Sequence, residues 1–330
     1  MTAQIERYQT ARDQGVAWLL QQMNDDGSIG PVDQDFTYYR MPWTFTISGH
    51  TDVALRVCEW VRANQFAPNG DFVGVTPRQI EANAYQNATF IYGAHMLRQF
   101  DLSYRGWSHL LTRQDRQSGG FTHLPNASGI AADENVPTVA QVGMAALMLG
   151  DLEAARGAGR WFRLVWDLQP APAHRLYYVF NAETQRLVTE FPAERAFHYV
   201  LEMQQPRQRF TCGGIAVAFL VRLFQATGDE DHIDLARAYM QQSMASTEQQ
   251  FEVSQVCKSG WGSALLYQIT REAEFRDWTC RVADFFVADQ QADGSWRDSG
   301  PYGQAPHVDI MVTAEFVMIL DTMIACLSLS

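Results

Sequence analysis

The chain has 330 residues, 25 Lys plus Arg against 37 Asp plus Glu, a formal net charge of −12, and 47% hydrophobic residues. This balance is typical of a soluble globular protein with a large core, and the acidic charge without a Lys/Arg cluster argues against nucleic acid as a partner. No signal-peptide pattern occurs at the N-terminus, and the odd number of cysteines, five, favours free thiols in a reducing, cytoplasmic compartment. Residues 310–329 form the most apolar run, but Glu315 and Asp321 interrupt it, which predicts a buried helix and no membrane span.

A short pattern recurs four times along the chain. A Gln near the end of a helical segment is followed by a turn containing Gly, and an apolar residue comes two positions after the Gly. The copies start at Gln22, Gln65, Gln114 and Gln291. Gly favours the left-handed conformation that ends a helix, and the Gln can satisfy open backbone groups there. The pattern predicts helical repeats whose loops are pinned onto the next helix by the apolar residue.

Breaks that contain Gly or an acidic residue divide the chain further into six helix pairs. We expect the first helices near 5–23, 50–66, 103–115, 151–168, 231–245 and 274–290, and their partners near 36–48, 83–99, 136–149, 210–227, 254–271 and 308–328. The first set is amphipathic, which predicts outer helices, whereas the second is apolar nearly all round, as in helices buried on every face. The sequence therefore predicts an all-α fold, an (α/α)6 toroid, as a single domain over residues 1–330.

Residues 170–209 do not fit this repeat, because they exceed any connection between two helices. The segments 176–180 and 186–191 flank a polar turn, which predicts a β-hairpin insert near 175–191. Long inserts in compact folds often form lids or rims. A surface hairpin without a role at the site is the alternative.

The stretch from Phe286 to Trp296, with Gln291 and Gly294 between them, resembles the repeat motif of squalene–hopene and oxidosqualene cyclases. The resemblance implies a toroid of the terpenoid cyclase and protein prenyltransferase superfamily, with a cavity suited to an apolar, ring-forming substrate. It transfers no catalytic residue, because the Asp-x-Asp-Asp acid of triterpene cyclases, the Asp-Asp-x-x-Asp diphosphate motif, the Asp-x-Cys zinc motif and the adjacent Cys-His pair of lanthionine cyclases are all missing.

The loops that lead into the inner helices meet at one end of a toroid, which makes that end the natural ligand site. Its candidate catalytic residues are Asp133, Glu134, His307 and Asp309. An Asp before an apolar helix with Pro137 in its first turn is also typical of an N-cap. We expect one acid of the first pair to cap the helix and the other to face the cavity, with its pKa raised by burial. His307 and Asp309 form either an acid–base pair or an N-cap beside a surface His.

The same end supplies a set of candidate substrate-binding residues: Tyr38, Tyr39, Arg40, Trp43, Tyr85, Cys212, Cys257, Lys258, Trp261, Tyr302 and Glu315. Glu315 lies in an otherwise apolar helix and needs a partner, which Lys258 or Arg40 could supply. Lys258 at the start of a helix is unfavourable to the helix dipole, which indicates an anionic partner or ligand. The aromatic residues either stabilise a cation through their ring faces or fill the core.

Cofactors and metals are not expected. The sequence has no Gly-rich phosphate loop, so neither a nucleotide nor a redox cofactor is indicated. Cys212, Cys257, His307 and Asp309 could together form a zinc set, but long-range spacing is unspecific and buried free Cys is common in cores.

The favoured function is that of a small-molecule cyclase or isomerase of specialised metabolism. It would close a ring in a terpenoid or polyketide-like substrate with help from a general acid. The alternatives are a carbohydrate-active toroid (lyase, unsaturated-glycoside hydrolase or epimerase) and a non-catalytic toroid that binds a partner protein. A deep apolar cavity with one or two acids favours the cyclase, and an open groove with many polar groups and stacked Trp favours the sugar. A filled barrel excludes both enzymes.

Overall fold

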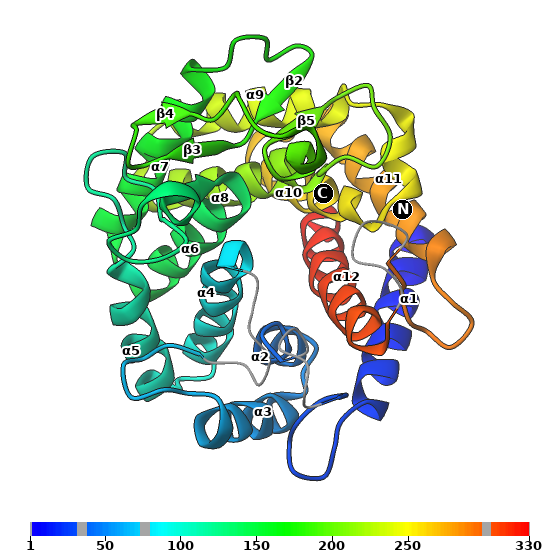
Figure 1. The fold of residues 1–330 in the computed structure, drawn as a ribbon. Coiled ribbons are helices and arrows are strands. Elements are labelled where there is room, and N and C mark those ends of the chain that lie inside the picture. The colour runs from blue at the N-terminus through cyan, green and yellow to red at the C-terminus, as the bar shows by residue number, and fades with distance from the viewer. Residues whose placement is uncertain (1, 32–37, 73–79, 299–304, 330) are drawn as a thin grey trace.

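The computed structural model describes residues 2–31, 38–72, 80–298 and 305–329. Its outer helices are α1 (Thr2–Gln21), α3 (Thr51–Asn64), α5 (Phe100–Leu111), α7 (Leu152–Asp167), α9 (Asp231–Met244) and α11 (Ala273–Asp289). The inner helices are α2 (Met41–Ile47), α4 (Ile80–Met96), α6 (Val136–Leu149), α8 (Thr211–Thr227), α10 (Cys257–Thr270) and α12 (Pro306–Ser328). The two sets alternate along the chain and close into a ring (Figure 1). The predicted (α/α)6 toroid is confirmed.

Burial divides the two sets as their sequences predict. In the outer helix α7, Trp161, Phe162 and Val165 are buried while Glu153 and Arg160 are exposed. By length and composition alone, the inner helix α12 could cross a membrane, but 78% of its most apolar stretch of 18 residues is buried within the fold. It is a core helix because its neighbours in the ring cover it from several sides.

The recurring turns build the ring by packing each loop on the next outer helix. Their glycines Gly27, Gly70, Gly119 and Gly294 have φ values of +90°, +90°, +86° and +91°. A Cβ on them would lie 2.7, 2.3, 2.3 and 2.7 Å from the backbone oxygens of Arg56, Arg105, Gly157 and Gln14, respectively. Those oxygens belong to α3, α5, α7 and α1, so the last turn closes the ring on the first helix.

Glutamine side chains hold two of these turns in place. Gln114 Nε2 donates to the backbone oxygens of Gly119 (3.1 Å) and of Ala154 (3.0 Å) on α7. In the last copy the Gln290 side chain makes the equivalent bonds, to Gly294 and to α1, whereas the side chain of the expected Gln291 bonds the end of α11, at Asp289 O. The apolar residue of each copy is buried as predicted: Ile29, Phe72, Phe121 and Trp296.

Two inner helices begin later than their sequences predict. α2 starts at Met41 instead of 36, because Arg40 occupies the N-cap and Pro42 the first turn; residues 36 and 37 lie outside the described residues. α10 starts at Cys257 instead of 254, since the 3₁₀ turns Glu248–Glu252 and Ser254–Val256 precede it.

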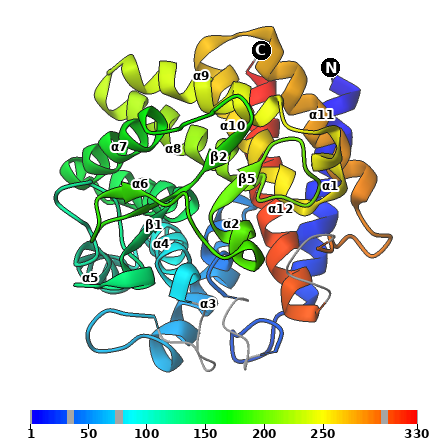
Figure 2. The same cartoon turned by 45° about the horizontal axis from the view of Figure 1, so that its top comes forward.

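The insert, together with β1, forms two small antiparallel sheets, and it lies in front of α6, α8 and α10 in Figure 2. The first joins β1 (Asp133–Asn135), β3 (Val179–Asn181) and β4 (Arg186–Leu187) in the order β1-β3-β4, and the second pairs β2 (Arg175–Tyr177) with β5 (Val200–Glu202). The predicted hairpin is present as β3–β4, with Phe180 opposite Leu187. Its strands are shorter than predicted, because β2 pairs with β5 instead of continuing the hairpin.

Candidate active-site cavity

A cavity of about 300 Å³ opens where the inner helices begin. It is lined by Tyr39, Arg40, Tyr85, Gln86, Asn135, Pro137, Thr138, His198, Arg209, Thr211, Ile215, Ser254, Gln255, Cys257, Lys258, His307, Val308, Met311, Val312 and Glu315. These residues come from all six inner helices or the segments just before them, and from the insert. The loops therefore converge at one end of the ring as expected, and fourteen of the twenty lining residues have polar or charged side chains, although apolar atoms contribute much of the surface.

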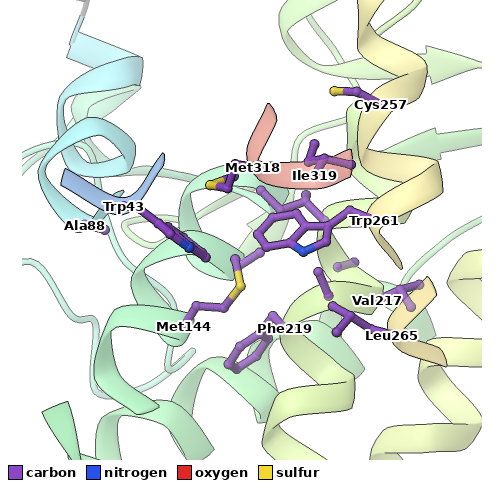
Figure 3. Packing of buried hydrophobic residues seen from close by; sticks show 14 of the residues in the cluster. Trp43, Ala88, Met144, Val217, Phe219, Cys257, Trp261, Leu265, Met318 and Ile319 are labelled. Carbon is purple, nitrogen blue, oxygen red and sulfur yellow. The ribbon is translucent and has the colours of Figure 1, made fainter. Parts of the chain in front are cut away.

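Below the cavity the ring is filled with apolar side chains. Trp43, Trp261 and Met318 each follow a cavity residue by three positions, so they lie about one helical turn deeper on the same face. Figure 3 shows the two indole rings with Met144 and Met318 beside them. The Trp43 ring is stacked on Tyr92, with centroids 4.0 Å apart, and meets Trp261 edge-on. The cavity thus has a packed floor.

Three buried charges lie at the side of this cavity. The Oε1 atom of Glu315 on α12 is 2.8 Å from Arg40 Nη2 and 2.5 Å from Lys258 Nζ. Burial opposes ionisation of Glu315, but the two cations hold its pKa below its ordinary value. Burial likewise opposes the charge of Lys258, but the carboxylate of Glu315 keeps the pKa of Lys258 above the ordinary value of a lysine. The pairing expected for Glu315 is confirmed, with both candidate partners at once.

The cations are surrounded by aromatic rings. Arg40 Nη2 donates to the Tyr85 hydroxyl at 3.3 Å, and the Arg40 guanidinium lies 4.6 Å from the centroid of the Tyr39 ring. Lys258 Nζ lies 4.6 Å from the centroid of the Trp261 ring. These contacts hold both cations in place by cation–π attraction and hydrogen bonding.

Histidine and arginine side chains complete the lining. His307, on the first turn of α12, is a predicted site residue and lies on the cavity. His198 and Arg209 come from the insert, which therefore forms part of the rim. Sequence reasoning missed both, together with Ser254 and Gln255, because the insert and the 3₁₀ turns carry no periodic pattern. For His198, the available signal in the sequence was that a histidine occurs inside a long insert.

The predicted acids Asp133 and Glu134 do not line the cavity, and neither caps α6. The N-cap is Asn135, whose side chain accepts a hydrogen bond from Thr138 N at 2.9 Å. Asp133 and Glu134 lie instead in β1, opposite Asn181 and Phe180 of β3. The expectation of one cap and one cavity acid was wrong, because strand pairing with the insert displaces the start of the helix.

Both acids are held by neighbouring side chains. Asp133 accepts hydrogen bonds from Asn181 Nδ2 (2.8 Å) and the Tyr199 hydroxyl (3.3 Å). Glu134 accepts bonds from Ser118 Oγ at 2.9 Å and from Trp161 Nε1 at 2.6 Å. Burial raises the pKa of Glu134 to about 8. This acid is protonated at neutral pH, but it faces Trp161 on α7 and does not reach the cavity.

Several other predicted site residues also lie off the lining. Asp309 is partly buried, and desolvation raises its pKa, although Arg297 opposes this. Tyr38 packs against Trp60 and Phe90, while Trp43 and Trp261 form the floor, so two of the expected aromatic residues, Tyr39 and Tyr85, reach the cavity wall. Tyr302 lies outside the described residues.

The cysteines Cys212 and Cys257 are buried free thiols. Cys257 lines the cavity and Cys212 does not. Burial raises the pKa of both, and that of Cys212 reaches about 12, so both are protonated at neutral pH. Among the described residues no group of three or more His, Cys, Asp or Glu side chains could hold a metal ion, and the four-residue zinc set is not brought together.

No protein-family model and no curated protein sequence matches this chain. Solved structures do resemble it. A GH76 α-mannanase from Bacteroides thetaiotaomicron aligns with a TM-score of 0.66 at 12% identity over 96% of this chain and 95% of its own. A D-mannose isomerase aligns with 0.67 at 10% identity over 96% and 97%. A type II terpene cyclase from Scytonema, solved with geranylgeranyl dihydroxybenzoate, aligns with 0.61 at 12% identity over 99% and 100%.

These likenesses, at such low identity, establish the α/α-toroid fold and no more. Each of the three is similar to this chain over almost its whole length, so the ring is shared as a unit. The fold is used for both sugar and terpenoid chemistry in these proteins, and function must therefore be argued from the cavity itself.

Proposed function

We propose that the protein is a small-molecule isomerase or cyclase that rearranges one oxygenated substrate by general acid–base catalysis. The observation that carries the proposal is the presence of two imidazoles, His198 and His307, with the Tyr39 and Tyr85 hydroxyls, around one cavity of about 300 Å³. Imidazole accepts and donates protons close to neutral pH, which suits it to move a proton within a bound substrate. One imidazole would remove a proton from a carbon next to a carbonyl, and the other would protonate the product.

Of the two ring-closure substrates expected from the sequence, the lining favours the polyketide-like one. A carbocation would be repelled by Arg40 and Lys258, and among the described lining residues two tyrosines supply the aromatic surface that could stabilise it. A substrate with several carbonyls instead offers acceptors to the polar groups of the lining. Ring closure then follows when the carbanion formed by proton removal attacks a second carbonyl of the same molecule.

A carbohydrate isomerase or epimerase is the second candidate, and the polar lining favours it. Gln86, Asn135, Ser254 and Gln255 place amide and hydroxyl groups around the cavity, as a polyhydroxylated substrate requires. The same proton transfer would convert an aldose into a ketose. No Trp lines the cavity among the described residues, so a stacking platform would come from Tyr39 or Tyr85.

The test follows hydrogen exchange by NMR in D₂O. The purified protein is incubated with open-chain compounds that carry three or more carbonyls in one series, so that a carbanion has a distant carbonyl to attack, and with aldoses and ketoses in another. We expect deuterium to enter the carbon next to the carbonyl, and the product, a ring or a ketose, identifies the substrate class. His198→Ala and His307→Ala should each slow the exchange about 100-fold or more.

The matched control is His174→Ala, because His174 lies in the same insert but is exposed and outside the cavity. It should exchange at the rate of the unmodified protein. If both cavity-histidine variants retained that rate as well, the acid–base role would be wrong.

A further inference from the structure

We infer that the cavity contains a subsite for an anionic group of the substrate, a carboxylate or a phosphate, bound by Arg40 and Lys258. The inference rests on the proposed function only in taking this cavity as the substrate site. It adds the chemical class of the substrate, which that proposal leaves open.

The charges at the site do not balance. Arg40 and Lys258 both contact the same oxygen, Oε1 of Glu315, so one carboxylate serves two buried cations. The side chains of Arg40 and Lys258 are only 5% and 2% exposed, so water does little to solvate their charge. A buried charge without a counterion is costly, and a substrate anion would offset that cost. This surplus of positive charge occurs in a chain whose net charge is −12.

Two helix ends strengthen the positive potential here. Lys258 is in the first turn of α10, and the N-cap Val256 provides no side-chain cap. α8 likewise begins at Thr211 behind Phe210, without a side-chain cap, and Thr211 lines the cavity. Uncapped N-termini carry partial positive charge and donor N–H groups. A lysine at such a position is favourable only when enough negative charge lies beside it.

Within the described part of the chain, two hydrogen-bond donors of Arg40 are unsatisfied at this wall of the cavity. Its Nη2 atom serves Glu315 and Tyr85, whereas Nε and Nη1 are buried and have no hydrogen-bond partner among the described residues. Gln255 adds an Nε2 donor in the same condition. Buried donors are normally satisfied, and planar guanidinium groups suit carboxylate and phosphate oxygens. An anion in the cavity next to Arg40 would meet both requirements.

The experiment measures binding by isothermal titration calorimetry with three probes of similar shape: benzoate, phenyl phosphate and the neutral benzamide. We expect at least one of the anions to bind about 10-fold or more tightly than benzamide. Arg40→Gln and Lys258→Gln should each weaken anion binding about 10-fold and leave benzamide binding unchanged. Glu315→Gln should strengthen anion binding, because it removes the carboxylate that contacts both cations.

Arg222→Gln is the matched control. Arg222 is on inner helix α8 with its guanidinium 5.1 Å from the Trp261 ring centroid, yet it does not line the cavity, so anion binding should not change. Thermal unfolding of each variant identifies any that fails to fold, and the comparison of anions with benzamide on the unmodified protein needs no variant.

Anions that bind no more tightly than benzamide to the unmodified protein and to Glu315→Gln would overturn the inference. The outcome is separate from that of the proposed function, since binding is measured without turnover. His198→Ala and His307→Ala should lose hydrogen exchange and keep anion binding. Preference for benzoate or for phenyl phosphate then distinguishes a carboxylate from a phosphate substrate.

Discussion

Replacing Glu134 by Gln should remove a loss of stability that the unmodified protein undergoes as the pH rises. The carboxyl is buried among Ser118, Trp161 and the loop at Gly120, and its pKa of about 8 in the fold compares with an ordinary value of 4.5. Below pH 4.5 it is protonated in both the folded and the unfolded chain. Between pH 4.5 and 8 the unfolded chain ionises first, so the free energy of unfolding falls as pH rises.

The size of the effect follows from that difference. Each pH unit in this window costs about 1.4 kcal/mol, so the stability lost by pH 8 approaches about 5 kcal/mol and the loss between pH 5 and pH 7 is about 2.5 kcal/mol. Glutamine keeps an acceptor for Trp161 and a donor for Ser118, but it does not ionise. We therefore expect the stability of E134Q relative to the unmodified protein to increase by about 2.5 kcal/mol between these two pH values.

Urea unfolding at pH 5 and pH 7, followed by circular dichroism, measures this difference. Glu190→Gln is the control, because Glu190 is an exposed acid in the insert. A stability difference between E134Q and the unmodified protein that is the same at both pH values would refute the reasoning. So would an E134Q protein that loses stability at pH 7 relative to pH 5 as steeply as the parent.

Two further predictions concern the fold. Gly294→Ala should lower the free energy of unfolding by more than Gly150→Ala: both have positive φ, which costs about 1–2 kcal/mol, but only at Gly294 would the new Cβ meet backbone, 2.7 Å from Gln14 O, while Gly150 has open space. Equal losses in thermal unfolding would contradict the close packing of the turn. Asp151→Ala should cost about 1–2 kcal/mol, because the side chain caps α7 through Ala154 N at 3.0 Å and also accepts from Trp107 Nε1 at 3.1 Å; Asp151→Asn should cost less, because its one oxygen can still cap the helix. Urea titration compares the two, and similar losses would count against capping.

Much of the ring could be predicted because its signals are local. Amphipathic and fully apolar helices differ in their residues, and a Gly at a helix end followed by a large apolar side chain marks each turn. The exceptions have non-local causes. Helix α6 begins at Val136 with Asn135 as its cap, since β1 pairs with β3, and Asp133 bonds Asn181, 48 residues further on. Nothing near Asp133 in the sequence indicates that pairing.

The candidate site was predictable to the extent that helix starts determine it. Arg40, Lys258 and Glu315 come from three helices, and their meeting could be inferred because a carboxylate in an apolar helix needs a cationic partner. His198 and Arg209 could not be placed in this way. Their position depends on how the insert folds across the end of the ring, and that is decided by the short β2–β5 pairing and the irregular turns around it.

The contact of the final turn with α1 has a consequence for how the chain folds. Neighbouring helix pairs can assemble in sequence, as in open repeat proteins. The ring is complete only when Gln290 bonds Ala11 and Arg12 pairs with Asp321, a contact between residues 309 positions apart. Contacts of such long separation form late and slow folding. Because this seam joins the first and last helices, a chain cut at another surface loop and rejoined at the seam would retain every inter-helix contact of the ring.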